Sequence, residues 1–186
     1  MFKYGSFRSF VIKSTFGIIF SFFAVVYLGS LYSYSSNDPG FNMALDNQEY
    51  IISNYFGLFG ANLSSYSIVL IGTLSFVIGI FLLIEGIKLA VGFKNKLITL
   101  KVFAHFIGII LINVFISNYN IESFNTGLVP QFIYSYISEL IILFTTNSAV
   151  INIIYFLLFL LGVFLINFSF SIKLNYYLKI LNSFRI

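Results

Sequence analysis

Glu85 and His105 are the residues whose types and positions come closest to chemistry in this chain. A carboxylate near an apolar helix is a candidate ion or proton site, and a histidine can relay protons or bind a metal ion. Lys88 follows Glu85 by three positions, on the same helical face, which predicts an ion pair at the membrane interface. His105 is the only histidine and has no carboxylate near it in sequence, which favours an interfacial hydrogen-bonded role over a relay or ligand.

Motifs that would supply other chemistry are missing. The sequence has no G-x-x-x-x-G-K-[ST] phosphate loop, no G-x-G-x-x-G and no H-E-x-x-H. It also has no cysteine, which excludes disulfides and thiolate metal sites. We therefore expect no enzymatic activity and no cofactor or metal. Neutral Asn113, Asn152 and Asn167 are expected to form hydrogen bonds between helices.

The elements that carry these residues are predicted to be membrane-spanning helices. Only 9% of the 186 residues are charged, whereas about 25% is typical of soluble domains. A helix needs roughly 20 apolar residues to cross about 30 Å of hydrocarbon, and none of the long uncharged stretches shows the alternation of a barrel strand. The uncharged stretches cover residues 14–37, 50–84, 102–121 and 140–172.

The charges predict which side of the membrane each segment faces. All basic residues lie in three clusters, whereas connections 33–66 and 117–149 carry acidic residues only. By the positive-inside rule the basic clusters are cytoplasmic, which explains them without contact with nucleic acid. A fifth span at 128–144 would put the last cluster outside, so this segment is predicted to be an amphipathic outer-face helix. The clusters are Lys3, Arg8 and Lys13; Lys88, Lys94, Lys96 and Lys101; and Lys173, Lys179 and Arg185.

The predicted fold is therefore an all-α membrane protein with four transmembrane helices and both ends inside. Because a helix over 50–84 would be too long for one crossing, we expect Gly57 and Gly60 to break it. A cleavable signal peptide is the alternative for the first span, although its apolar stretch exceeds the usual 7–15 residues or so. We expect a basic cytoplasmic tail at 1–13, the four-helix domain at 14–172, and a cytoplasmic tail at 173–186. Spans are expected near 14–33, 65–90, 101–118 and 149–171, with outer loops 34–64 and 119–148 and inner loop 91–100.

Small residues recur on one face of the first two predicted spans. Such stripes let helix backbones approach closely, which is how helices associate in lipid. We expect them to pack helices within one four-helix unit, and an oligomer interface is the alternative. The expected packing residues are Gly17, Ser21, Gly72, Ser75, Gly79 and Gly86.

The outer connections carry a distinctive pattern. Asp38-Pro39-Gly40, which predicts a turn, follows the first span, and Asn54-Tyr-Phe-Gly57-Leu-Phe-Gly60-Ala61 leads toward the second. This order resembles the N-terminal four-helix membrane domain of the FtsK/SpoIIIE family of DNA translocases, which carries Asp-Pro, a variable stretch and Asn-x-x-Gly-x-x-Gly-Ala before a long second span. We expect these residues to shape the outer loop rather than to contact a partner.

The resemblance implies a membrane anchor that targets a DNA translocase to the division septum of the bacterial inner membrane during cell division and chromosome segregation. It implies the lipid bilayer, other division proteins and further copies of the chain as partners. Family members continue into a cytoplasmic ATPase whose motifs this sequence lacks. We therefore expect a separate motor chain, a truncated or split member, or an anchoring role alone. A small transporter or channel subunit, or a structural subunit of another membrane complex, remains an alternative.

Overall fold

The structure is a computed structural model that describes residues 7–41, 51–93, 97–119 and 126–171. Six helices lie within these ranges, and no strand occurs in them. This confirms the predicted all-α membrane class. The helices are α1 (Phe7–Tyr32), α2 (Gly57–Ile71), α3 (Ser75–Ala90), α4 (Ile98–Ser117), α6 (Leu128–Phe144) and α7 (Ser148–Phe170).

Length and composition make α1, α4 and α7 able to cross a membrane. Helices α2 and α3 pass the same test only together, as a pair bent by 116° at a short break. The described residues therefore contain three candidate spans, and a fourth if the bent pair counts as one span. Helix α6 is apolar but shorter, as expected for an outer-face helix.

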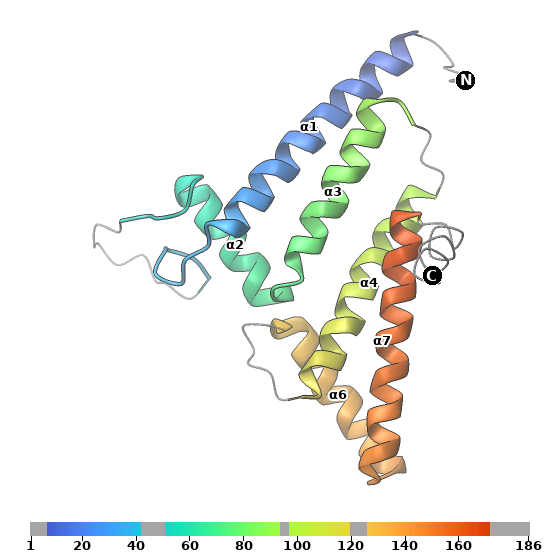
Figure 1. Cartoon of the computed structure of the whole chain (residues 1–186). Coiled ribbons are helices and arrows are strands. Elements are labelled where there is room, and N and C mark those ends of the chain that lie inside the picture. The colour runs from blue at the N-terminus through green and yellow to red at the C-terminus, as the bar shows by residue number, and fades with distance from the viewer. Residues whose placement is uncertain (1–6, 42–50, 94–96, 120–125, 172–186) are drawn as a thin grey trace, which may run out of the picture.

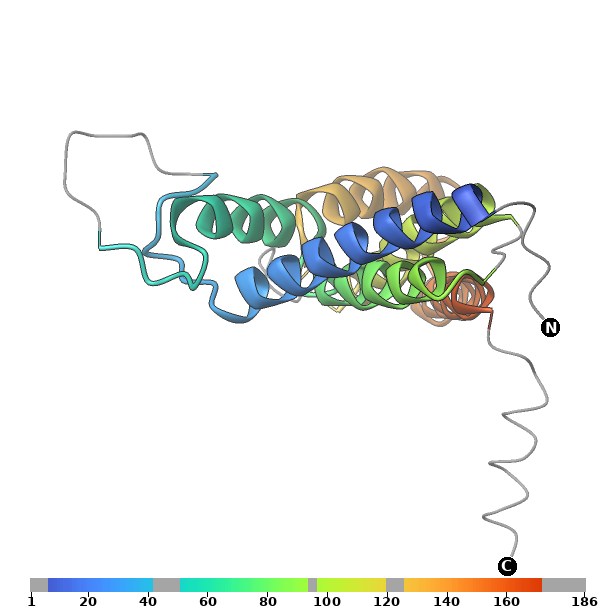
Figure 2. The same cartoon turned by 90° about the horizontal axis from the view of Figure 1, so that it is seen from above.

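The long helices form two antiparallel pairs (Figure 1). Helix α1 packs mainly against α3, and α4 packs mainly against α7, whereas α3 and α4 touch each other only slightly. Helices α2 and α6 touch each other and connect the two pairs, on the same side of the molecule in the view from above (Figure 2). The start of α1 and the ends of α3 and α7 lie toward the same end of the molecule, which agrees with the predicted topology.

Glycines set the spacing within each pair. A Cβ on Gly17 would overlap the backbone of Ala90, and one on Gly86 would come within 2.7 Å of the Ser21 hydroxyl. Gly79 likewise faces α1, where a Cβ would reach side chains of Tyr27 and Leu28. Four of the six expected packing residues, Gly17, Ser21, Gly79 and Gly86, therefore lie between α1 and α3 of one chain.

The expectation of one continuous helix over 65–90 is wrong. The helix starts earlier, at Gly57, and breaks after Ile71. Gly72 has a φ of 87°, a conformation that side chains with a Cβ rarely adopt, so it ends α2 rather than packing on a helix face. The hydroxyl of Ser75 donates to the carbonyl oxygens of Ser67 (2.9 Å) and Gly72 (2.7 Å), which places it in the bend as well.

Two residues from the second half of the chain contact this bend. The amide of Asn113, on α4, donates to the Ile71 carbonyl at 2.7 Å, as expected for a neutral residue that bonds between helices. Gly127, at the start of α6, lies so close that a Cβ there would overlap the backbone of Ile71 and Gly72. Irregular backbone is tolerated at membrane depth where protein buries it, and Gly72 and Ser75 are both buried.

The other predicted boundaries differ by shorter distances. Helix α1 begins at Phe7, ahead of the expected 14, and α4 and α7 agree with the expected 101–118 and 149–171 to within a few residues. Basic side chains near helix ends can extend to the interface while their stems remain in apolar surroundings, so a helix can start before the hydrocarbon does. The tail at 173–186 and the first residues of the tail at 1–13 lie outside the described residues.

Candidate functional site at the outer end of the first helix pair

The two parts of the outer motif meet beside the end of α1. Asp38-Pro39-Gly40 lies in the loop after α1, and Asn54 lies just before α2. Asp38 and Asn54 are each 5% exposed, although both belong to connecting segments. Pro39 is buried and Ala61 is 1% exposed. Residues far apart in sequence thus form one cluster, which is largely buried although Ser53 is exposed and is here called the outer cluster: Asp38, Pro39, Gly40, Ser53, Asn54, Gly60, Ala61, Ser64 and Ser65.

Asn54 connects the end of one helix to the start of the next. The last turn of a helix leaves carbonyl groups without partners in the helix. The Asn54 amide nitrogen donates to one of these in α1, the carbonyl oxygen of Ser30 (2.8 Å), and to the carbonyl oxygen of Ser33 just after the helix (3.3 Å). Its amide oxygen accepts from the backbone N–H of Phe56 at 3.1 Å, just before α2. One asparagine therefore satisfies groups of opposite polarity at two helix ends.

The two glycines of the motif serve different needs. Gly57 has a φ of 59°, and a Cβ added to it would have no neighbour within 4 Å, so its backbone conformation is what favours glycine. Gly60 has ordinary backbone angles, but a Cβ there would collide with the Asn54 amide oxygen and come within 2.9 Å of the Ser30 hydroxyl. Gly57 thus allows α2 to start, and Gly60 allows α2 to approach α1.

Asp38 ties the loop after α1 to the segment before α2. Its Oδ1 accepts from both the backbone N–H (2.8 Å) and the hydroxyl (2.9 Å) of Ser53. Its other oxygen, Oδ2, is buried without a hydrogen-bond partner among the described residues. Burial, and secondarily the charge of Asp38, raise the pKa of Tyr34 above its ordinary value, because both disfavour a phenolate at that position.

Gly40 completes the connection to α2. A Cβ at this position would overlap the side chain of Ser65, and the neighbouring Phe41 N–H donates to the Ser65 hydroxyl at 3.0 Å. The Phe41 ring also meets Tyr66 edge to face at 5.4 Å. The loop after α1 is therefore held on the surface of α2 by a polar and an aromatic contact.

The chemistry that this cluster offers is hydrogen bonding. The hydroxyls and amides satisfy backbone groups, and among the described residues no three His, Cys, Asp or Glu side chains gather to hold a metal ion. Buried polar clusters whose members satisfy one another fix a single arrangement of the backbone around them. The outer cluster is thus built to hold the residues just after α1 and those just before α2 against the two helices.

The two residues with potential for chemistry lie elsewhere. Glu85 accepts from the Lys88 ammonium at 2.7 Å, so the predicted ion pair is present. His105 is hydrogen-bonded, with its Nδ1 2.9 Å from the Ser169 hydroxyl, but it is fully buried rather than interfacial. Its ring stacks on Phe81 with a centroid distance of 4.2 Å and meets Phe170 edge to face. His105 therefore packs α4 against α3 and α7.

Several contributors were not identified from the sequence. Ser30 and Ser64 are ordinary serines in serine-rich segments, and nothing in their spacing separates them from neighbours that bond only within their own helix. Ser53 is an isolated serine whose sequence surroundings give no sign of its bond to Asp38. Gly162 is a further example: a Cβ there would reach the Gly108 carbonyl oxygen at 2.8 Å, so these two glycines set the distance between α4 and α7. The sequence signal that could have identified this contact is a glycine within a long apolar stretch, which often marks a close approach of two helices.

One known protein family matches nearly the whole chain. The family described as the 4TM region of DNA translocase FtsK/SpoIIIE matches residues 11–182, which include the outer cluster and all four apolar stretches. Comparisons with curated proteins and with solved structures find no match. The resemblance inferred from the outer motif is confirmed, and the chain is a multi-pass membrane protein that belongs to the four-helix membrane-region family of FtsK/SpoIIIE DNA translocases.

Proposed function

We propose that this chain is the membrane anchor of an FtsK-type DNA translocase and directs it to the division septum of the bacterial inner membrane. The family match over residues 11–182 carries the proposal. In this role the chain contributes to cell division and chromosome segregation without catalysing a reaction itself. Its partners are the bilayer, other division proteins, further copies of the chain, and a motor that another chain can supply.

The arrangement of the helices supports an anchoring role. The start of α1, the end of α3, the start of α4 and the end of α7 lie toward one end of the molecule (Figure 1). The sequence places that end in the cytoplasm, because all three basic clusters belong to it. A motor attached or bound there lies on the side of the membrane that holds DNA, while the segments that the outer cluster holds in place lie on the other side, where division proteins can contact them.

The test is the location of a fluorescent fusion in dividing cells. Wild-type chain is expected to concentrate at mid-cell, and a uniform signal around the cell periphery would overturn septum targeting. Asn54→Asp is expected to reduce the mid-cell fraction, because it disturbs the outer cluster. The matched control is Asn62→Asp, since the Asn62 amide bonds only to the Leu58 carbonyl of its own helix (2.9 Å) among the described contacts.

Membrane fractionation separates targeting from insertion. Both asparagine variants are expected to reach the membrane in wild-type amounts, because each replaces one polar residue by another and removes no apolar side chain. Equal loss of mid-cell signal in Asn54→Asp and Asn62→Asp would contradict a specific role for the outer cluster.

A further inference from the structure

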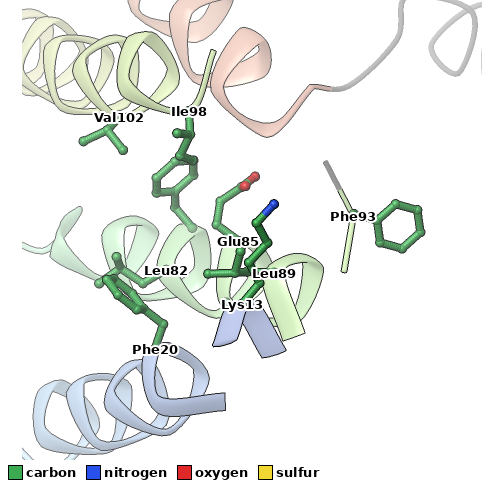
Figure 3. A pocket seen from close by; sticks show the side chains of 10 residues that line it. Lys13, Phe20, Leu82, Glu85, Leu89, Phe93, Ile98 and Val102 are labelled. Atoms are coloured by element: carbon green, nitrogen blue, oxygen red, sulfur yellow. The ribbon is translucent and has the colours of Figure 1, made fainter. Parts of the chain in front are cut away.

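The inner end of the molecule contains a cavity that the outer cluster does not use. Its volume is about 540 Å³, within the range of roughly 300–1,000 Å³ that small-molecule pockets occupy. It lies between the inner parts of α1 and α3 and the first turn of α4 (Figure 3). Its walls are almost entirely apolar and include Phe20, Phe81, Leu82, Leu89, Ile98 and Val102.

The packing of the helices explains why this space exists. Glycines bring α1 and α3 together, and Gly86 of that interface also lines the cavity. Helices α3 and α4 touch only slightly, so the gap between the two helix pairs remains partly open to the side. From Phe81 to Leu89 the cavity follows α3 for about 12 Å, at 1.5 Å rise per residue. This is close to half of about 30 Å of hydrocarbon, the depth of one leaflet.

Charged side chains stand at one side of this apolar space. Figure 3 shows the side chains of Lys13 and Glu85 pointing toward the same side of the cavity. Glu85 is paired with Lys88 at 2.7 Å. Lys88 does not line the cavity, but its ion pair with Glu85 offsets the charge of that carboxylate, so the ammonium of Lys13 supplies the positive charge of the lining. Lys13 is exposed, so its ammonium is accessible to a ligand.

We propose that the cavity binds an acyl chain of an anionic phospholipid of the inner leaflet, whose phosphate contacts Lys13. Basic pockets between transmembrane helices on the cytoplasmic side are suited to anionic headgroups, and the apolar walls match an acyl chain. A free phosphate ion has no apolar part that could contact those walls. The inference does not depend on the proposed role in cell division.

Native mass spectrometry of the full chain tests this proposal. The probes are phosphatidylglycerol and phosphatidylcholine with identical acyl chains, and the anionic lipid is expected to bind more tightly. Lys13→Gln is expected to weaken phosphatidylglycerol binding about fivefold and to leave phosphatidylcholine nearly unchanged, since one lysine near an anionic headgroup contributes about that factor. Arg8→Gln is the matched control, because Arg8 is an exposed cation on the same helix outside the cavity lining.

A second variant tests the apolar part of the site. Val102→Phe adds volume to the wall from α4 and is expected to weaken binding of both lipids severalfold. Equal effects of Lys13→Gln and Arg8→Gln would overturn the proposal, because they would indicate general attraction to a basic surface. Unchanged binding of both lipids to Val102→Phe, with helix content preserved in circular dichroism, would also overturn it, because the acyl chain would then lie elsewhere.

Discussion

Asn54→Asp is expected to destabilise the fold, because it removes a hydrogen-bond donor while keeping the size and the acceptor of the side chain. The amide nitrogen of Asn54 donates to the carbonyl oxygens of Ser30 and Ser33 at 2.8 and 3.3 Å. A carboxylate at the same place can only accept hydrogen bonds, so it leaves these carbonyls without their donor. Its oxygen can still accept from Phe56 N–H, which isolates the effect on α1 from that on α2.

The size of the effect follows from these contacts. Two lost hydrogen bonds cost about 0.5–1.5 kcal/mol each, and a buried group left without a partner costs about 1–3 kcal/mol. A negative charge near the C-terminus of α1 adds about 0.3–1 kcal/mol, since that end of a helix carries partial negative charge. The terms overlap, and together they predict a loss of about 2–4 kcal/mol at pH 8.

The assay is unfolding in mixed micelles with increasing SDS, in which far-UV circular dichroism follows the loss of helix. Asn62→Asp is the control for the added charge, because the Asn62 amide bonds only within α2. Acidification is expected to recover part of the loss, since a protonated carboxyl donates one hydrogen bond. If Asn54→Asp remained within about 0.5 kcal/mol of wild type at pH 8, the idea that Asn54 joins the two helix ends would be refuted.

Three further outcomes are expected. Asn113→Leu removes the 2.7 Å bond to the Ile71 carbonyl and should cost about 1–2 kcal/mol in the same SDS titration; an unchanged unfolding curve would contradict a stabilising role for this bond. Gly72→Ala forces a Cβ into a backbone with φ 87° and should cost about 1–2 kcal/mol, whereas no loss would mean that the bend tolerates other backbone angles. Asp38→Asn removes a charge that raises the Tyr34 pKa, so NMR titration of ring-labelled tyrosine should show that pKa falling; Tyr34→Phe assigns the signal.

The sequence predicted the features that depend on the length of the apolar stretches and on the side of the membrane where the charged residues lie. Four uncharged stretches and three basic clusters suffice to predict a helical fold and the side on which each helix end lies. They also predict the number of spans, which is four if the bent pair of α2 and α3 counts as one. The bend at Gly72 was missed because glycine in a transmembrane helix is common and often serves packing, as Gly79 and Gly86 do here. Gly72 differs from them in its φ of 87°, in the hydrogen bond from Asn113 to the neighbouring Ile71 carbonyl and in the close approach of Gly127, none of which the local sequence reveals.

The candidate site was predicted in part for a similar reason. Asn54, Gly57 and Gly60 were identified because their spacing matched a family pattern. A break was expected at both glycines, but α2 starts at Gly57 and continues through Gly60. Their polar partners were not predictable, because hydroxyls of Ser30 and Ser64 also bond to carbonyls four residues earlier and look like ordinary helix serines. The contacts that join α1 to α2 connect residues more than twenty positions apart, which local pattern does not reveal.

The short α3 has a consequence for the lipid around it. Its 16 residues extend about 24 Å, less than the roughly 30 Å thickness of an average hydrocarbon layer. Since α2 turns away by 116° instead of continuing the crossing, the bilayer beside α3 has to be thinner there or be replaced by neighbouring protein. Such hydrophobic mismatch costs fractions of a kcal/mol per Å, so the chain is expected to favour thinner bilayer regions and close protein neighbours on this side.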